Sequence, residues 1–529
     1  MRTSTTNAIV LVLLIALLFG ALWPAFQSPG PPEDEGIALV YPEMFIKGRL
    51  PYRDFETIYG PGNLLVLCGT YRLFGDNIFV ERTVGLIYRL LILLAMMAIA
   101  HRFGIVLAFA AGLVVAIIFA GTDLFANTWW AATAFALMSM LLAEKRESRW
   151  LCSGAGVLFA LAVLCRCDIG PVAIIGFLPL TLAMQRKSLV AFLIGAFVGF
   201  LPLAWFAAVI GPGQLVHALF IFPVFELSSS AYLPLSSAPI ELRWIFYLSI
   251  FAGVINLIAS FMALRHGRPK GGRLFLAAAI FGAGSIYYAL SRFDGTHVIN
   301  ATLVSIGLLP VSLQILISKK FHVQYASLAA AVIALAAVHA VYFHYARYFY
   351  RNLRVAIHLD QPREAKWGEP LEPGDKGFFI RNGDRCFPLG RTAVADLAQR
   401  LVTELVRISA PGQKLLVGPG DLRRTVGADT FFYHLLPALE PATYYLEMNP
   451  GSTNATDSRL ASDVAGTAWL ILDRSWDYIN EPNRSSEFGS DVPNQIVREK
   501  FDLWAEYGPY LLMRSQRLRN SLQLPPGQQ

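Results

Sequence analysis

Long apolar runs separated by short polar segments fill the first two thirds of the chain. A helix needs about 20 apolar residues to cross the hydrocarbon core of a bilayer. Windows of this kind are centred near residues 8–25, 82–100, 104–121, 129–143, 151–165, 170–184, 188–210, 243–264, 274–290, 298–317 and 322–343. The pattern therefore predicts about 11 transmembrane helices. The first run lacks a small-residue cleavage site before Pro24, so we expect a retained anchor rather than a signal peptide.

After about His344 the composition becomes that of a soluble domain. Helical patterns cover residues 391–408, 430–439, 458–464 and 495–506, and strand patterns cover 414–417, 443–446, 468–472 and 510–513. Alternation of this kind predicts a small α/β domain with a mostly parallel sheet. We therefore expect a membrane domain over residues 1–343 and a second domain over 344–529.

Composition places the chain among polytopic membrane proteins. Hydrophobic residues make up 55% of the sequence and charged residues only 15%, whereas soluble domains have about 25% charged residues. The net charge of +7 could suggest nucleic-acid binding, but the basic residues lie in short clusters between apolar runs, which is typical of cytoplasmic loops. We therefore exclude nucleic acid as a partner and expect the lipid bilayer instead.

The basic clusters also predict the orientation. They are His101-Arg102, Lys145-Arg146 with Arg149, Arg186-Lys187, the group Arg265, Arg268, Lys270 and Arg273, and Lys319-Lys320. Cytoplasmic loops are enriched in Lys and Arg, so these five loops are expected inside the cell. The intervening loops and the C-terminal domain are then extracytoplasmic. The acidic motifs are all expected on this outer side; they are Asp34-Glu35, Asp54, Glu56, Asp123, Asp168 and Asp294.

The first outer loop, residues 28–81, carries the most specific pattern in the chain. Two amphipathic runs, 37–46 and 64–74, are predicted to be short helices along the membrane interface. Between them, residues 48–62 contain prolines and glycines that indicate a constrained loop. The acidic pair Asp34-Glu35 stands directly before the first run.

These features resemble the GT-C superfamily of glycosyltransferases, and within it bacterial enzymes similar to aminoarabinose transferases and protein mannosyltransferases. The resemblance rests on the first span, Asp34-Glu35, Gly48-Arg49-Leu50-Pro51-Tyr52-Arg53-Asp54-Phe55, Gly60-Pro61-Gly62 and Tyr71-Arg72-Leu73-Phe74-Gly75. It covers the motifs of residues 1–90 and only the architecture beyond. It implies a polyprenyl-phosphate sugar donor, and a glycan, lipid or protein acceptor on the outer face of the cytoplasmic (inner) membrane.

By this resemblance Asp34 is the catalytic carboxylate and Glu35 its neighbour. Inversion by a single displacement needs a base that takes the acceptor's hydroxyl proton, while polyprenyl phosphate leaves already ionised. Some relatives use a divalent cation, and Asp34 with Glu35 could bind Mg²⁺ or Mn²⁺. The alternative is that Asp34 caps the helix that begins at Gly36.

Two outer turns repeat an Arg-x-Asp arrangement. They are Arg166-Cys167-Asp168 and Arg292-Phe293-Asp294, and the second is followed by His297. We expect Arg166 or Arg292 to bind the donor phosphate and the acidic and histidine side chains to bind sugar hydroxyls. Alternatively, each Arg pairs with its own Asp at a helix end.

The loop adds Arg53 and Asp54 as candidate substrate-binding residues. Lys47 and Arg49 lie beside them as further candidate phosphate ligands. For Lys47, Arg49 and Arg53 the alternative is contact with lipid phosphates.

Two other classes of function stay open. A transporter or lipid-linked sugar flippase should carry ionisable residues near the bilayer middle and internal repeats. Here the charges lie mostly at span ends and no repeated halves are visible. A non-catalytic subunit of an envelope complex would keep the fold without needing a carboxylate at position 34.

Overall fold

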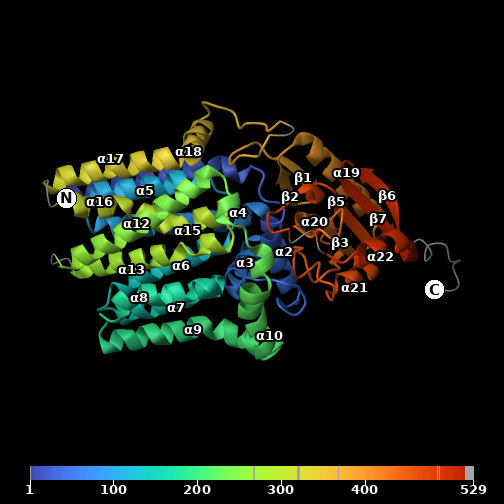
Figure 1. The fold of residues 1–529 in the computed structure, drawn as a ribbon, viewed down its shortest axis with the longest axis horizontal. Helices are drawn as coiled ribbons and strands as arrows, with labels where there is room; N and C mark the ends of the chain where they lie inside the picture. The colour runs from blue at the N-terminus through green and yellow to red at the C-terminus, as the bar shows by residue number, and fades with distance from the viewer. Residues whose placement is uncertain are drawn as a thin grey trace.

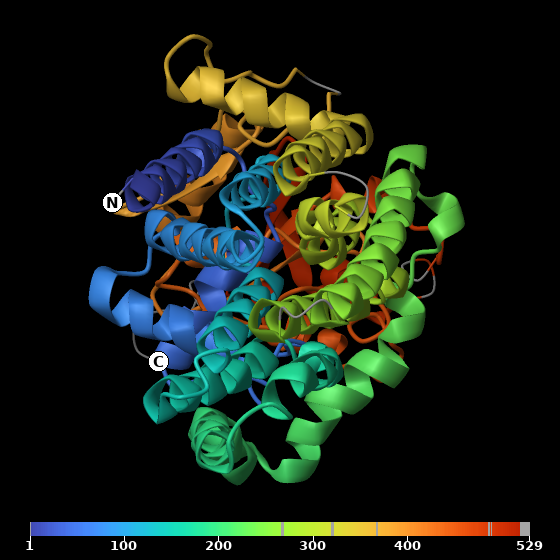
Figure 2. The same ribbon diagram turned by 90° about the vertical axis from the view of Figure 1, so that its left-hand side faces the viewer.

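The computed structural model describes residues 2–265, 269–318, 322–366, 369–484, 487 and 489–518. A helical bundle and a smaller domain built on a β-sheet lie end to end along the longest axis of the molecule (Figure 1). Figure 2 looks at the bundle from the N-terminal end, with the strands of the C-terminal domain behind the helices.

The bundle supplies the membrane spans. In the described part of the chain, seven helical segments are long and apolar enough to cross a membrane, judged by length and composition, and four shorter helices are also apolar. The long segments comprise α1 (Arg2–Leu22), α4 (Ile78–His101), α9 (Arg186–Ile210), α12 (Ile240–Arg265), α13 (Pro269–Ser285) with α14 (Tyr288–Ser291), α15 (Gly295–Gly307) with α16 (Leu309–Ile317), and α17 (Val323–Val341). The shorter ones are α5 (Ile105–Phe119), α6 (Thr128–Ala143), α7 (Arg149–Cys165) and α8 (Gly170–Thr181). Each predicted window overlaps one of these segments, which confirms a polytopic helical membrane protein.

Small residues let neighbouring spans approach closely, as is common where helices pack in lipid. A Cβ atom on Gly156 of α7 would lie 2.0 Å from the Phe192 carbonyl oxygen of α9. A Cβ atom on Gly195 of α9 would lie 1.9 Å from the Ser153 carbonyl oxygen of α7. The backbones of α7 and α9 are therefore in direct contact at these two glycines.

The first outer loop forms the two predicted helices, α2 (Asp34–Ile46) and α3 (Pro61–Phe74). Both lie between the bundle and the C-terminal domain (Figure 1). α3 begins with Pro61, whose fixed φ suits the first helical position, and α4 begins after Asn77, whose side chain accepts a hydrogen bond from the Val80 amide. α2 itself packs against the C-terminal domain.

The C-terminal domain contains an antiparallel hairpin and a five-stranded mixed sheet. The hairpin consists of β1 (Phe378–Asn382) and β2 (Arg385–Leu389), and the sheet has the order β4-β3-β5-β7-β6. Its strands are β3 (Lys414–Pro419), β4 (Glu440–Pro441), β5 (Trp469–Asp473), β6 (Phe501–Tyr507) and β7 (Tyr510–Ser515), and its helices are α19 (Thr392–Ile408), α20 (Phe431–Leu435), α21 (Leu460–Ala465) and α22 (Val492–Lys500). Only β3 makes parallel pairs, with β4 and β5, whereas β7 is antiparallel to β5 and β6.

The α/β character of this domain is confirmed, and three details of its prediction are wrong. The sheet is mixed rather than mostly parallel. Residues 443–446 are not a strand, and residues 501–506 belong to β6 instead of continuing a helix. In that last case, pairing with β7 along a whole edge outweighs the helical pattern of the isolated segment.

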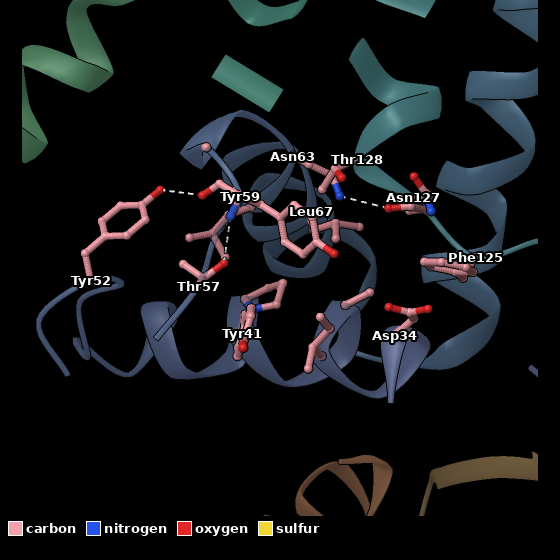
Figure 3. A pocket seen from close by; sticks show the side chains of 16 residues that line it. Asp34, Tyr41, Tyr52, Thr57, Tyr59, Asn63, Leu67, Phe125, Asn127 and Thr128 are labelled. Atoms are coloured by element: carbon pink, nitrogen blue, oxygen red, sulfur yellow. Dashed lines mark hydrogen bonds between the residues drawn. The ribbon is translucent and has the colours of Figure 1, made fainter. Parts of the chain in front are cut away.

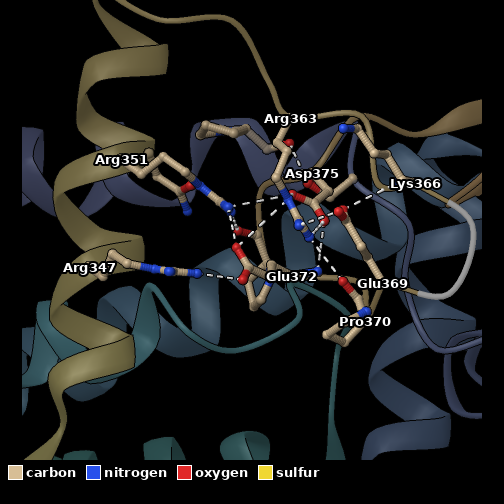
Figure 4. A network of polar contacts seen from close by, with 12 residues as sticks. Arg347, Arg351, Arg363, Lys366, Glu369, Pro370, Glu372 and Asp375 are labelled. Carbon is tan, nitrogen blue, oxygen red and sulfur yellow. Dashed lines mark hydrogen bonds and ion pairs between the residues drawn. The ribbon is translucent and has the colours of Figure 1, made fainter.

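A network of charges holds the connection between the two parts of the molecule (Figure 4). The connection follows α18 (Phe343–Ala356) and runs to β1. Arg363 pairs with Asp375 at 2.6 Å, and Arg351 and Arg347 both pair with Glu372. Asp375 also lies 3.4 Å from Arg351, so Glu372 and Asp375 both bind the connecting segment to α18. α18 itself packs on α1 and α5.

Candidate functional site

A pocket opens between α2, α3 and the start of α6, at the end of the bundle that faces the C-terminal domain (Figure 3). Its empty volume is about 580 Å³, with open solvent at its mouth included. The lining residues are Asp34, Ile37, Ala38, Tyr41, Pro42, Tyr52, Thr57, Tyr59, Gly60, Asn63, Leu64, Leu67, Phe125, Ala126, Asn127 and Thr128. The helical spacing of Asp34, Ile37, Ala38 and Tyr41 presents one face of α2 to this pocket.

The pocket walls are held by hydrogen bonds between neighbouring segments. The Tyr52 hydroxyl donates to the Tyr59 carbonyl at 2.7 Å, and the Asn63 side-chain amide donates to the Ala126 carbonyl at 2.8 Å (Figure 3). The first bond closes the loop between α2 and α3. The second joins α3 to the segment before α6, so that the walls come from three separate parts of the chain.

Among the described residues that line the pocket, Asp34 is the only acidic one. Its side chain lies at the pocket edge (Figure 3), and no described residue donates a hydrogen bond to it or forms an ion pair with it. α2 begins at Asp34, with Glu33 in the cap position and no side-chain cap bond, so the described helix does not use Asp34 as its cap. The carboxylate is therefore available to a molecule in the pocket.

The electrostatics around Asp34 favour its protonated form. Burial and then the negative charge of Glu447 raise the pKa of Asp34 to about 6, while His297 acts in the opposite direction. Glu33 shows the same trend, because burial and the charge of Asp34 raise its pKa well above the ordinary value. A carboxyl group with a pKa of about 6 can both accept and release a proton near neutral pH.

Glu35 has a different environment from Asp34. Both of its carboxylate oxygens bind Arg82 of α4, at 2.6 and 2.7 Å, and its side chain is fully buried. Arg82 also donates to the backbone carbonyls of Ala25, Phe26 and Ser28. Glu35 thus joins the start of α2 to α4 and to the end of the first span, and it does not line the pocket.

The same geometry bears on the expected cation. Since both oxygens of Glu35 are bound by Arg82 and Asp34 faces the pocket, the two carboxylates are not arranged to hold one ion together. Among the described residues, no group of three or more His, Cys, Asp and Glu side chains could hold a metal ion. The residues present do not fit the predicted Mg²⁺ or Mn²⁺, which stays a prediction from sequence.

Arg166 and Asp168 form a bidentate ion pair beside the pocket, at 2.9 and 2.6 Å. Arg166 also donates to the Tyr288 hydroxyl at 3.1 Å, and the rings of Tyr59, Trp129 and Tyr288 surround its guanidinium group at 4.6 to 5.5 Å. Arg166 therefore pairs with its own Asp168, which is the alternative that the sequence left open. Because Tyr59 belongs to the pocket lining, Arg166 stands directly behind that wall.

The second Arg-x-Asp turn, Arg292-Phe293-Asp294, forms polar side-chain contacts with more residues than the first. Asp294 Oδ1 accepts hydrogen bonds from the backbone and the ring of His297, each at 2.9 Å, and Asp294 Oδ2 accepts from Arg292 at 2.9 Å. Burial raises the pKa of Asp294, but the contacts with His297 and Arg292 outweigh it and lower the pKa to about 2. Arg292 also pairs with Glu481 of the C-terminal domain at 2.5 Å.

The structure does not bring Arg53 and Asp54 into the pocket lining. They pair with one another at 2.8 Å, and the Arg53 side chain is about half exposed. Asp54 also accepts a hydrogen bond from the Leu50 amide at 2.7 Å, which shapes the turn of the loop. Their contacts are local to the segment between α2 and α3.

Sequence reasoning missed Glu447, a carboxylate that the C-terminal domain places beside the pocket. Glu447 is 5% exposed and lies against Tyr41, which faces the pocket from α2. The spacing of seven residues between Asp34 and Tyr41 could have indicated that both side chains lie on the same face of the helix. Glu447 lies in an irregular segment far along the chain, and no linear pattern marks it.

Comparison with known proteins finds the fold among solved structures only. No protein-family model matches the sequence, and no curated protein matches it. The crystal structure of ArnT from Cupriavidus metallidurans bound to undecaprenyl phosphate is similar at 15% identity, with a TM-score of 0.55 over 96% of this chain and 97% of that one. The apo form of the same protein gives 14% identity and a TM-score of 0.55, over 97% and 98%. The chain therefore shares the overall fold of ArnT, with a polytopic helical bundle followed by a C-terminal domain.

Proposed function

We propose that this protein is an inverting glycosyltransferase. It moves a sugar from a polyprenyl-monophosphate donor to an envelope glycan, lipid or exported protein on the outer face of the cytoplasmic membrane. The observation that carries the proposal is the Asp34 carboxylate, which lines a pocket at the end of the bundle without any described partner. The fold that the chain shares with ArnT, which binds undecaprenyl phosphate in its crystal structure, supports a donor of this type.

The reaction needs one base and no acid. Asp34 accepts the proton of the acceptor hydroxyl, and the acceptor oxygen forms a bond to the anomeric carbon of the donor sugar. On the opposite side of that carbon, the bond to the phosphate oxygen breaks and polyprenyl phosphate leaves as an anion. With a pKa of about 6, Asp34 is ionised at neutral pH and is a stronger base than an ordinary carboxylate.

The Arg-x-Asp turns are proposed to bind the donor. Arg166 is adjacent to the pocket through Tyr59, and Asp294, His297 and Arg292 influence the charge state of Asp34. Both arginines already pair with carboxylates, so binding a phosphate requires them to share or exchange these partners. Asp168, Asp294 and His297 have the hydrogen-bonding groups that sugar hydroxyls require.

The charges inside the spans do not favour the transporter alternative. Glu81, Arg82 and Arg89 are buried in α4, but each binds a segment at the outer end of the bundle. Glu81 accepts from the Ala126 amide, and Arg89 donates to the carbonyls of Leu124 and Phe125. These contacts fix the segment that forms the pocket wall, so the three charges have a structural role at that end of the bundle.

A deletion strain tests the proposal. Lipid extracts analysed by mass spectrometry should show one polyprenyl-phosphate sugar accumulating, and one envelope glycan should lack that sugar. Periodate, which does not cross membranes, is then added to intact spheroplasts. Oxidation of the accumulated sugar places it on the outer leaflet, as loss of a transferase requires. Protection from periodate would place it inside and would favour a flippase. If no lipid-linked sugar changes, the glycosyltransferase proposal is wrong.

A further inference from the structure

The C-terminal domain contacts α2 on both sides of the pocket-lining residues. Near its start, the Thr430 hydroxyl donates to the Glu33 carbonyl at 2.8 Å. Near its end, Arg385 donates to the Glu43 carboxylate at 2.7 Å, and Glu43 is buried. The C-terminal domain therefore binds α2, the helix that carries Asp34, near both of its ends.

Between these contacts the domain reaches the pocket wall itself. The Tyr41 hydroxyl donates a 2.6 Å hydrogen bond to Glu447 Oε1, and the Asn449 amide donates to Glu447 Oε2 at 2.9 Å. Both oxygens of Glu447 are thus engaged. Tyr41 follows Asp34 by two helical turns on the same face of α2, as Figure 3 shows, so Glu447 supports this face from behind.

We propose that Glu447 is a positioning residue of the site, which holds the Tyr41 side chain as a pocket wall and keeps a negative charge close to Asp34. The inference rests on the proposed function. It gives the C-terminal domain a role in the reaction, because a nearby anion opposes the ionisation of Asp34 and so makes its carboxylate a stronger base. Glu447 does not touch the reacting atoms in this account.

Several other charges act on Asp34. They are Glu33 at the preceding position, Arg292, Asp294 and His297 at the start of α15, and Asp123 in the segment between α5 and α6. Burial is the largest influence on Asp34, and Glu447 is the largest among the charges. Removing the Glu447 charge alone should therefore make Asp34 lose its proton at lower pH.

The test is carbodiimide labelling of Asp34 in the purified full-length protein. A hydrophobic carbodiimide reacts with protonated carboxyl groups, and mass spectrometry of the peptide that contains Asp34 reports its labelling across pH. In the unchanged protein, labelling should fall as pH rises through about 6. In Glu447→Gln, which keeps a hydrogen-bond acceptor for Tyr41, the midpoint should fall by about 0.5 to 1 pH unit. No substrate is needed, so failure of the proposed reaction cannot imitate either result.

Tyr444→Phe is the matched control. It removes a 3.2 Å hydrogen bond from the same domain to the Tyr52 carbonyl and changes no charge. Its labelling midpoint should equal that of the unchanged protein. An unshifted midpoint in Glu447→Gln, or an equal shift in both variants, would overturn the proposal.

A second variant covers the case in which Glu447→Gln does not fold. Tyr41→Phe removes the hydrogen bond that lowers the pKa of Glu447. Glu447 should then stay protonated, and therefore uncharged, up to a higher pH than in the unchanged protein. The labelling midpoint of Asp34 should then fall as well. No shift in Tyr41→Phe would contradict the role of this contact. Where transfer is measurable, the acidic limb of its pH profile should move with the labelling midpoint.

Discussion

Glu35 and Arg82 form a fully buried bidentate ion pair one residue away from the carboxylate that faces the pocket. Glu35→Gln should leave the buried Arg82 guanidinium without the carboxylate that binds it directly. Breaking one partner of a buried pair costs about 3–5 kcal/mol, so we expect a clear fall in the unfolding temperature of the detergent-purified protein. An unfolding temperature equal to that of the unchanged protein would show that this pair does not hold α2 in place.

Asp34→Asn should reduce transfer without reducing stability, in contrast to Glu35→Gln. The amide keeps the size of the side chain but cannot take a proton, so transfer should fall about 10²- to 10⁴-fold. Folding should be unaffected, because no described residue depends on the Asp34 carboxylate for a hydrogen bond. Glu499→Gln, at an exposed carboxylate of α22, is the control for expression and handling. Equal transfer by Asp34→Asn and Glu499→Gln would remove Asp34 from the reaction.

Transfer should lose activity as pH falls through about 6. The pKa of Asp34 is raised to about 6 by burial and by Glu447, so below that pH the base is protonated and cannot accept the acceptor's proton. The pH dependence of kcat/KM reports the free protein and is the quantity to measure. A limb near pH 4, the ordinary value for a carboxylate, would contradict the raised pKa.

The acceptor group should be an uncharged hydroxyl. Among the described residues that line the pocket there is no Lys, Arg or His, and the neighbouring Arg166 and Arg292 are proposed to bind the donor phosphate. A phosphate acceptor would therefore meet the negative charges of Asp34 and Glu447 without a cation of its own. The product should therefore be an ordinary glycoside, which survives mild acid that hydrolyses sugar phosphates. Release of the transferred sugar by mild acid would show a phosphate acceptor and would leave the transferase proposal itself intact.

Docking of the C-terminal domain should depend on Gly36. A Cβ atom at this position would lie 2.1 Å from Thr430 Oγ1 and 2.6 Å from the Phe431 amide nitrogen of α20. Gly36→Ala should therefore loosen the domain and speed its release by limited proteolysis of the segment after α18. Gly69→Ala is the matched control, since nothing lies within 4 Å of the added atom on α3. Equal proteolysis of the two variants would argue against this contact.

Much of the fold could be predicted from local patterns. Apolar windows located the spans, and the amphipathic runs of the first outer loop gave α2 and α3, because both signals are carried by neighbouring residues. The strand β6 was missed because its pairing with β7 is a tertiary effect that the isolated segment does not show. The mixed order of the sheet likewise depends on contacts between distant strands.

Sequence could locate part of the candidate pocket for a similar reason. Asp34 stood out through its place after the first span, and the structure puts it in the pocket. Sequence could not show that its neighbour Glu35 turns toward Arg82, since one helical step of 100° separates the two side chains. Nor could it show that Glu447 reaches Tyr41 across 406 positions of the chain.

The role of Asp34 as the base is tested most directly by measuring polyprenyl-phosphate sugars and envelope glycans in a deletion strain that carries either the unchanged gene or Asp34→Asn. The unchanged gene should restore the glycan and clear the lipid-linked sugar. Asp34→Asn, present in the membrane at equal amount, should leave the sugar accumulated and the glycan incomplete. If Asp34→Asn restores the glycan as well as the unchanged gene does, Asp34 is not the base of the reaction.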